Sequence, residues 1–265
     1  MTILLGYVGA LFIGLILGLT GGGGSILTVP ILVYVLGLNP VVATAYSLFI
    51  VGSTSAFGTI QNFRKGIVEI KTAFLFAIPS FIAVYSTRRF IVPAIPETIF
   101  QSDGFVLSKS TFLMVLFAIV MFVASLSMLK KKATYDVEEA TSSGLLIYSL
   151  IKIVLVGVLI GLVGAGGGFL IIPALVFIAR LPMRKAIGTS LLIIAINSLI
   201  GFTGDIGNQN IDWNFLVGFS AISIGGIFAG IYLNKFVNES QLKKGFGWFV
   251  LIMAIFIFLK ELFFK

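Results

Sequence analysis

The chain has 265 residues, of which 58% are apolar and 11% are charged, and it contains neither Cys nor His. Soluble domains carry charge on about 25% of their residues, so this composition indicates a polytopic membrane protein. The net charge of +8 is typical of Lys and Arg in cytoplasmic loops and does not indicate a nucleic-acid partner. Without Cys and His, thiolate chemistry, zinc sites and the commonest general base are excluded, so we expect no enzyme, no metal and no cofactor.

Ten hydrophobic segments are separated by polar or glycine-rich breaks, and two of them are too short for a span of about 20 residues. In chain order the predicted segments are Ile3–Leu19, Ile26–Leu38, Val41–Ile60, Ile70–Tyr85, Thr111–Leu129, Leu145–Val163, Phe169–Ala179, Ala186–Phe202, Trp213–Leu233 and Phe246–Leu259. The short ones are Ile26–Leu38 and Phe169–Ala179. The polar stretch Val92–Ser110 is predicted to be an extramembrane loop.

Basic residues concentrate in the connections that follow the odd-numbered segments, which lie on one side of the membrane if the segments alternate. This set comprises Arg64, Lys65, Lys71, Lys130–Lys132, Arg180, Arg184, Lys185, Lys235, Lys243 and Lys244. The positive-inside rule therefore predicts a cytoplasmic linker at Lys130–Gly144 and periplasmic termini. The main exceptions, Arg88, Arg89 and Lys109, fall in the connection between the fourth and fifth segments.

The chain repeats itself after a shift of 143 residues. Leu11–Gly58 then aligns without gaps on Val154–Gly201, with 17 identities in 48 positions, where chance would give about 4 or 5. We predict a first transmembrane repeat at 1–129, a linker at 130–144 and a second repeat at 145–265. Each repeat has five segments, so the second is expected to be inverted in the membrane, and the opposite loop charges agree with this. The fold predicted is all-α, with two inverted repeats.

Two glycine clusters at equivalent positions, Gly21–Gly24 and Gly164–Gly168, are predicted to break helices within the membrane. A break leaves backbone groups that must face protein or water, and the N–H groups at the start of the next helix suit an anion. The candidate ligands here are Gly21, Gly22, Gly23, Gly24, Gly164, Gly166, Gly167 and Gly168. A tight turn between two packed full-length helices remains an alternative. At Gly14, Gly18, Gly157 and Gly161, the Gly-x-x-x-Gly spacing predicts close helix contacts.

The third and eighth segments are rich in uncharged polar side chains, which can hydrogen-bond a desolvated anion. Ser47 and Thr54 lie two helical turns apart and share a face, and Ser190 and Asn197 repeat that spacing. We predict these four residues as substrate ligands. Bonding of the hydroxyl groups to their own helix, or between helices, is the alternative.

Few charges fall within the hydrophobic segments. Lys152 is expected to extend to the interface, while Asp205, Glu69 and Lys71 are placed at membrane edges, where they are solvated or gate or relay protons. The sequence contains no Walker A loop, which disfavours ATP-driven transport by this chain alone.

The motif G-x-x-G-G-G-G-x-x-x-x-x-P at Gly18–Pro30 recurs at Gly161–Pro173 with Ala165 in place of one glycine, and each copy is followed by A-x-x-x-S-L. This pattern resembles the TauE/SafE family of membrane proteins, the sulfite exporter or 4-toluene sulfonate uptake permease family. The resemblance implies a secondary transporter in the bacterial inner membrane for a small sulfur-containing anion such as sulfite, sulfoacetate or another organosulfonate. It also implies a coupling proton or ion.

From the repeat and the helix breaks we expect alternating access, with one repeat rocking against the other. A channel or cation carrier that uses the carbonyl groups at the breaks remains an alternative, as does a membrane assembly protein that transports nothing. The expected partners are the anionic substrate and the lipid bilayer. The oligomeric state, the substrate and the direction of transport are left open by the sequence.

Overall fold

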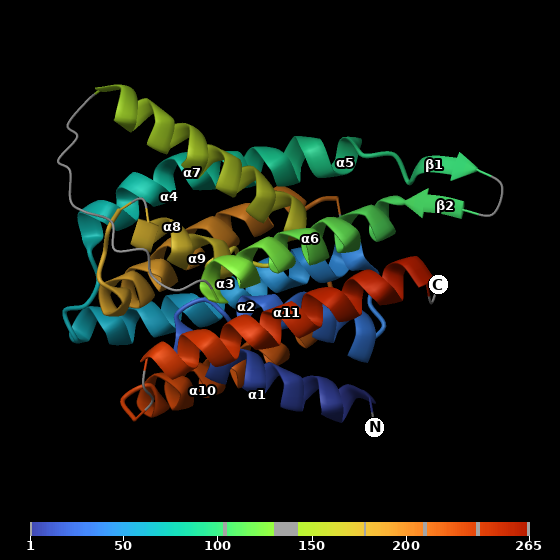
Figure 1. Ribbon diagram of the computed structural model, residues 1–265. Coiled ribbons are helices and arrows are strands. Elements are labelled where there is room, and N and C mark those ends of the chain that lie inside the picture. The colour runs from blue at the N-terminus through green and yellow to red at the C-terminus, as the bar shows by residue number, and fades with distance from the viewer. Residues whose placement is uncertain are drawn as a thin grey trace.

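The computed structural model describes residues 2–102, 105–129, 143–177, 179–208, 211–236 and 239–263. Long helices lie side by side along one direction, and a short β-hairpin extends beyond one end of the bundle (Figure 1). The elements in chain order are α1 Thr2–Thr20, α2 Ser25–Pro30, η1 Ile31–Val35, α3 Pro40–Arg64, α4 Ile70–Ser86, η2 Thr87–Ile91, α5 Val92–Ala94, β1 Thr98–Ser102, β2 Phe105–Ser108, α6 Lys109–Leu129, α7 Ser143–Val163, α8 Gly168–Phe177, α9 Met183–Asp205, α10 Trp213–Leu233 and α11 Glu239–Phe263. The all-α polytopic class predicted from composition is confirmed.

The helices are long and apolar enough to cross a membrane. Among the described residues, five have the required length and hydropathy, namely Pro40–Arg64, Ile70–Ala94, Lys109–Leu126, Met183–Asp205 and Trp213–Leu233. Large apolar side chains also face outward, including Leu4 at 69% exposure on α1, Ile151 at 61% on α7 and Ile252 at 62% on α11. A surface of this kind is stable in lipid and not in water.

The helices that follow the glycine clusters are short, as predicted. The first runs over Ser25–Val35, and its last five residues form a π-helical turn; the second is α8, with 10 residues. At 1.5 Å per residue each covers roughly 15 Å, about half the hydrocarbon thickness of a bilayer. The helix formed by α2 and η1 together, and α8, therefore have the length of half-helices.

Glycine faces bring helices of the two halves into backbone contact, as the Gly-x-x-x-Gly spacing predicts. A Cβ atom on Gly14 of α1 would lie 1.8 Å from the carbonyl oxygen of Ser223 on α10. In the equivalent contact, a Cβ on Gly157 of α7 would lie 2.8 Å from the carbonyl oxygen of Ser80 on α4. The 143-residue shift that relates Gly14 to Gly157 also relates Ser80 to Ser223. The two contacts are therefore equivalent, with the halves exchanged. Opposite orientation of the halves in the membrane, and the domain limits given above, stay predictions.

The fourth predicted segment is longer than expected. The sequence predicts its end at Tyr85, but the helix continues through the π-helical turn η2 and α5 to Ala94. The prediction that Val92–Ser110 is wholly a loop outside the membrane is therefore wrong at its start, where Val92 is buried at 3% exposure. The rest of this stretch contains the antiparallel hairpin of β1 and β2, which the sequence analysis did not predict.

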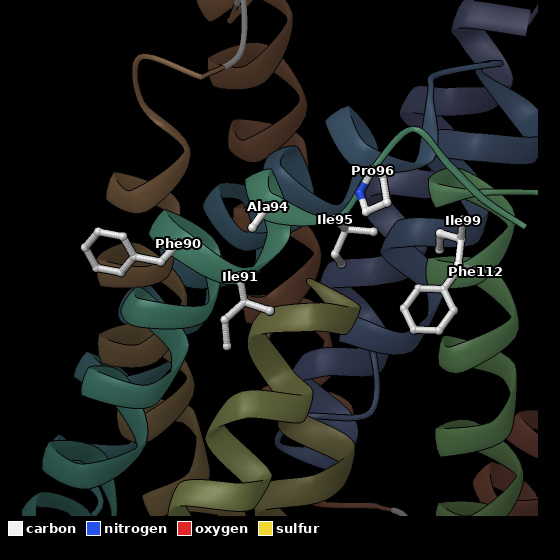
Figure 2. A pocket seen from close by; sticks show the side chains of 7 residues that line it. All are labelled: Phe90, Ile91, Ala94, Ile95, Pro96, Ile99 and Phe112. Atoms are coloured by element: carbon white, nitrogen blue, oxygen red, sulfur yellow. The ribbon is translucent and has the colours of Figure 1, made fainter.

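A shallow pocket of about 540 Å³ lies between this helix end, the hairpin and α6. Figure 2 shows its side chains, all of them apolar: Phe90, Ile91, Ala94, Ile95, Pro96, Ile99 and Phe112. An anion needs hydrogen-bond donors or positive charge, and this lining offers neither. The pocket is therefore not a candidate site for an anion.

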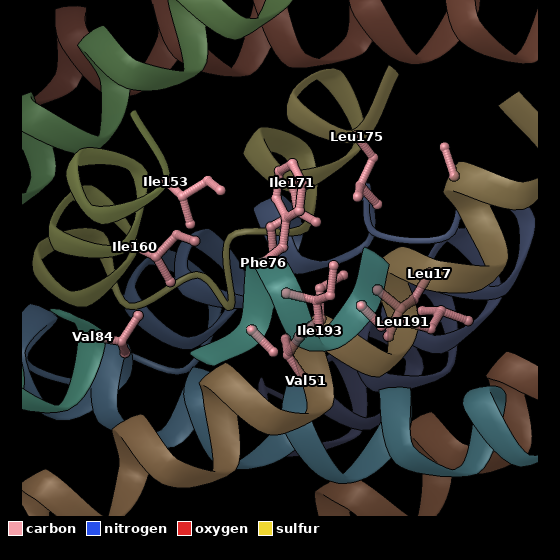
Figure 3. Close-up of a cluster of buried hydrophobic side chains, with 14 of the residues drawn as sticks. Leu17, Val51, Phe76, Val84, Ile153, Ile160, Ile171, Leu175, Leu191 and Ile193 are labelled. Atoms are coloured by element: carbon pink, nitrogen blue, oxygen red, sulfur yellow. The ribbon is translucent and has the colours of Figure 1, made fainter. Parts of the chain in front are cut away.

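The hydrophobic core joins both halves of the chain. Figure 3 shows one buried cluster in which Leu17, Val51 and Phe76 of the first half lie among Ile160, Ile171 and Leu191 of the second. These side chains come from α1, α3, α4, α7, α8 and α9. Side chains of the two halves thus interleave in one shared hydrophobic core.

Basic residues of three loops come together at the end of the bundle opposite the hairpin. Burial and the positive charges of Lys235 and Arg184 lower the pKa of the Lys65 ammonium group, which places the α3–α4, α8–α9 and α10–α11 loops within electrostatic reach of one another. Figure 1 shows these loops at one end of the bundle. The common side predicted for these basic loops is confirmed, whereas the residues Lys130–Lys132 lie outside the described part of the chain.

Each end of the bundle has a polar contact that joins the two halves. At the basic end, the N–H of Glu69 donates to Thr189 Oγ1 at 3.0 Å, and the Glu69 carboxylate pairs with Lys185 at 2.5 Å. At the other end, the N–H of Asp212 donates to the Tyr46 hydroxyl at 2.7 Å. The 143-residue shift maps Glu69 onto Asp212 and Tyr46 onto Thr189. The ends therefore share one contact, and at the basic end the ion pair of Glu69 with Lys185 accompanies it.

Neighbouring glycines of α10 provide a test of the α1–α10 contact. A Cβ on Gly226 would lie 2.3 Å from the carbonyl oxygen of Leu11, whereas a Cβ on Gly225 would meet nothing within 4 Å. We expect Gly226→Ala to lower the free energy of unfolding by about 1–3 kcal/mol through overpacking, and Gly225→Ala to leave it equal or up to about 1 kcal/mol higher. Thermal unfolding of both variants in detergent measures this, and equal effects would contradict the contact.

Candidate functional site

The first glycine cluster interrupts a helix and caps its own backbone. Helix α1 ends at Thr20, and Gly21 turns the chain with φ of 75°, a conformation that favours glycine. The N–H of Gly21 still donates to Leu17 O, and the N–H of Gly23 donates to the Thr20 hydroxyl at 2.8 Å. The Ser25 hydroxyl donates to the carbonyl of Gly22. The N–H groups of Gly22 and Gly24 have no acceptor among the described residues, so this break is satisfied in part from within.

The second cluster lacks these caps. The repeat replaces Thr20 by Val163 and Ser25 by Gly168, so neither hydroxyl is present. Gly164, Gly166 and Gly167 all have φ near 70°. Within the described residues, the N–H groups of Gly166, Gly167 and Gly168 have no hydrogen-bond acceptor, and they precede the 10-residue helix α8. The second break is thus the better donor site for an anion.

The two breaks touch each other, as expected from the repeat. A Cβ on Gly22 would lie 2.8 Å from backbone atoms of Gly168, and a Cβ on Gly168 would lie 2.3 Å from the carbonyl oxygen of Gly22. Only residues without a side chain can approach this closely. The breaks therefore form one continuous backbone region at the contact between the halves.

Each break is contacted by a helix of the other half: α3 contacts the second break and α9 contacts the first. A Cβ on Gly164 would meet Thr44 of α3, and a Cβ on Gly21 would meet Ile187 of α9; the 143-residue shift relates these positions. The Ser190 hydroxyl donates to the carbonyl oxygens of Gly21 at 2.5 Å and Ile187 at 2.9 Å. In this conformation the proton of Ser190 holds the first break in place. Its role as a substrate ligand stays a prediction.

The other three predicted side-chain ligands are buried with unused donors. Ser47, Thr54 and Asn197 are all at 0% exposure. The hydroxyl groups of Ser47 and Thr54 and the amide nitrogen of Asn197 have no hydrogen-bond partner, whereas the Asn197 oxygen accepts from Ser80 at 3.0 Å. Ser198 is also buried and unpartnered, and its hydroxyl lies 3.0 Å from the position of a Cβ on Gly166. Such groups cost stability unless a ligand or water satisfies them.

A buried ion pair lies beside the second break. Arg88 of η2 is at 0% exposure, and its Nε and Nη2 atoms lie 2.7 and 2.6 Å from one carboxylate oxygen of Asp205, the last residue of α9. Its Nη1 atom donates to the Thr44 hydroxyl at 3.1 Å and to the carbonyl of Gly161 at 3.4 Å. Thr44 also contacts Gly164, so the Thr44 side chain lies between the guanidinium and the second break.

This pair is not among the site residues predicted from the sequence. The prediction that Arg88 lies in the connection after the fourth segment is wrong, because the helix continues through it. For Asp205, burial contradicts the solvated alternative, while its position at a membrane edge stays a prediction. One signal was present in the sequence. The shift that aligns the repeats maps Arg88 onto Ile231, inside the apolar segment Trp213–Leu233.

The remaining charged candidates are at the surface. Glu69 and Lys185 pair with side-chain exposures of 38% and 47%. Lys71 and Lys152 are exposed. No group of three or more acidic residues that could hold a metal ion occurs in the described residues.

The sequence matches the model of one family, described as Sulfite exporter TauE/SafE, over residues 7–257. The chain belongs to the sulfite exporter TauE/SafE family. A probable membrane transporter protein of Xylella fastidiosa strain 9a5c is 31% identical over 92% of this chain and 90% of its own length. A second similar protein, the probable membrane transporter protein YunE of Bacillus subtilis, is 26% identical over 93% of each chain.

An archaeal relative matches a smaller part. The probable membrane transporter protein MJ0441 of Methanocaldococcus jannaschii is 37% identical over 43% of this chain and 45% of its own length. No solved structure matches this member of the TauE/SafE family. Family membership and the name of the family thus agree with the resemblance drawn from the glycine motifs.

Two buried threonines of α3 test whether the unused hydroxyl groups are costly. Thr54 has no hydrogen-bond partner, whereas Thr59, also buried, donates to Ser55 O at 2.8 Å. We expect Thr54→Val to raise the free energy of unfolding by about 1 kcal/mol, because an unpaired polar group is removed, and Thr59→Val to lower it by about 0.5–1.5 kcal/mol. Thermal unfolding without substrate measures both, and a loss of stability in Thr54→Val would show that its hydroxyl is bonded.

Proposed function

We propose that this chain is a secondary transporter that moves a small sulfur-containing anion across a bacterial inner membrane by alternating access. The substrate class is sulfite, sulfoacetate or another organosulfonate. Membership of the sulfite exporter TauE/SafE family and the names of its relatives, probable membrane transporter proteins, support transport and an anionic sulfur substrate. The anion binds where the two glycine breaks meet.

The site is supported by one observation: the two glycine breaks touch, and hydrogen-bond donors of the backbone and of buried side chains near them have no acceptor. The N–H groups of Gly166, Gly167 and Gly168, at the start of α8, have no acceptor among the described residues. In α3 and α9, the side-chain donors of Ser47, Thr54 and Asn197 are buried without a partner. A desolvated oxyanion accepts several such hydrogen bonds at once, which offsets the cost of removing it from water.

A cation carrier that uses the carbonyl groups at the breaks is less well supported. At the first break, the carbonyl oxygen of Gly21 already accepts from Ser190, and that of Gly22 accepts from Ser25. The carbonyl groups of Gly23 and Gly24 accept from the N–H groups of Ile26 and Leu27. The four carbonyl groups of the first break are therefore occupied, and a cation would have to use those of Gly164, Ala165 and Gly166, which have no donor among the described residues.

Reciprocal contacts support alternating access. The equivalent pairs Gly14–Ser223 and Gly157–Ser80, and the equivalent loop contacts of Glu69 and Asp212, are what two repeats related by a two-fold axis would form. Opening one end while the other remains closed then requires only that the repeats exchange conformations. With the basic loops in the cytoplasm, the termini are periplasmic.

Two serines on α3 provide a matched test of the site. Ser47 is buried and unpartnered, whereas the hydroxyl of Ser53 donates to carbonyl groups of its own helix at 2.8 and 3.1 Å. In proteoliposomes loaded with unlabelled sulfite, we expect Ser47→Ala to reduce the uptake of labelled sulfite at low concentration by about tenfold, because one hydrogen bond to a charged group is lost. Ser53→Ala should stay within about twofold of the wild type, since its hydroxyl does not face the anion.

The same assay separates the alternatives. A carrier is accelerated by unlabelled substrate on the far side of the membrane, whereas a channel is not. Absence of flux by the wild-type protein for sulfite and for sulfoacetate would contradict the transport function and favour an assembly protein. Equal loss in Ser47→Ala and Ser53→Ala would contradict the site and leave the function standing.

A further inference from the structure

Arg88 has hydrogen-bonding capacity that the folded chain does not use. The guanidinium carries five N–H donors. Those on Nε and Nη1 donate to Asp205, Thr44 and Gly161, whereas Nη2, although 2.6 Å from the same Asp205 oxygen, makes no hydrogen bond of good geometry and is fully buried. Buried donors of an arginine are rarely left without an acceptor.

The residue before Arg88 adds a second unused donor. Thr87 is at 0% exposure and its hydroxyl has no partner. Its side chain packs against Gly161, where a Cβ would lie 2.6 Å from Thr87 Cβ. The carbonyl of Gly161 also accepts from Arg88. Two consecutive residues of the π-helical turn therefore bring an incompletely hydrogen-bonded guanidinium and an unpartnered hydroxyl to the end of α7, three residues before the second break.

Neutralisation by one aspartate allows this charge to remain buried. Asp205 is the only acidic residue, among those the structure describes, that forms an ion pair with Arg88. Its side chain keeps 4% exposure while that of Arg88 has none. A bare guanidinium here would be costly, and a fully satisfied ion pair would leave nothing for a ligand. The observed pair is neutral overall and only partly satisfied.

We propose that Arg88 supplies the positive charge that binds the transported oxyanion, through Nη2 and with the Thr87 hydroxyl, and that Asp205 positions the guanidinium and offsets its charge. The proposal rests on the transport function proposed above and adds a charged residue to the site. A sulfite or sulfonate group has three oxygens at one end, which suits the planar, multidentate guanidinium better than a single ammonium group. The offsetting carboxylate weakens the hold on the anion so that the anion can leave.

The experiment uses detergent-purified full-length protein and proteoliposomes. The anion-dependent rise in unfolding temperature is titrated with sodium sulfite and sodium sulfoacetate, with sodium gluconate at the same ionic strength as the control. Arg88→Gln/Asp205→Asn removes both charges and leaves no unpaired ion, so it is expected to fold. We expect its half-saturating anion concentration to rise about tenfold or more relative to the wild type.

Asp205→Asn alone is the second variant and has the opposite expectation. It leaves a net positive charge at the site, so the half-saturating anion concentration should fall about tenfold while the maximal flux also falls, because the anion leaves more slowly. A purely structural ion pair would lower stability in this variant without tightening anion binding. Because the unpaired Arg88 charge lowers its stability without anion, recovery of that stability by sulfite and not by gluconate supports the proposal, and equal effects of the two salts contradict it.

The surface pair provides the matched control. Glu69→Gln/Lys185→Gln also neutralises one ion pair between the halves, but at an exposed position, and should leave the half-saturating concentration within about twofold. Wild-type binding and flux that persist unchanged in Arg88→Gln/Asp205→Asn would overturn the role of Arg88 and leave the transport function intact. No anion-dependent shift or flux in the wild type would overturn both.

Discussion

A helix that ends inside an apolar protein leaves backbone N–H and C=O groups that have to be satisfied where water is scarce. This chain has two such ends, at Gly21–Gly24 and Gly164–Gly168, and the surrounding structure is arranged around them. The first is closed by hydroxyl groups of Thr20, Ser25 and Ser190, each bonded to a neighbouring backbone group. The second has Val163 and Gly168 at the positions equivalent to Thr20 and Ser25, and its N–H groups at Gly166, Gly167 and Gly168 have no acceptor among the described residues. Side chains therefore cap the first break in part, and the second has more unpaired N–H groups.

Close approach of backbones is the second requirement, and it explains where the glycines lie. At four glycines the neighbouring main chain lies so close that a Cβ atom would overlap it. They are Gly22 and Gly168 where the breaks meet, and Gly14 and Gly157 in the helix contacts. These contacts join the first half of the chain to the second. Since helices in lipid gain no hydrophobic energy from association, tight van der Waals packing of this kind holds the halves together.

Much of this arrangement could be predicted from the sequence. The breaks, the short helices α2 and α8, the glycine contacts and the common end of the basic loops all follow from local patterns, because each depends on residue type at a fixed spacing. The burial of Arg88 could not be predicted in this way, because two adjacent arginines look like the end of an apolar segment. The partner that makes this burial tolerable, Asp205, lies 117 residues away in the sequence. The hairpin at β1 and β2 was also missed, as it depends on pairing between two short, weakly patterned strands. Long-range compensation of charge is the information that local patterns lack.

Equivalent hydrogen bonds join the two halves at the two ends of the bundle, and at the basic end the partly exposed ion pair of Glu69 with Lys185 accompanies this bond. Both side chains are partly exposed, so dissolved salt screens their attraction. The bond between Asp212 and Tyr46 involves no pair of opposite charges and is insensitive to screening. Dissolved salt therefore weakens the contact between the halves at the basic end and leaves its equivalent at the other end unchanged. The same hydrogen bond, repeated in two halves, thus has a different salt dependence at each end.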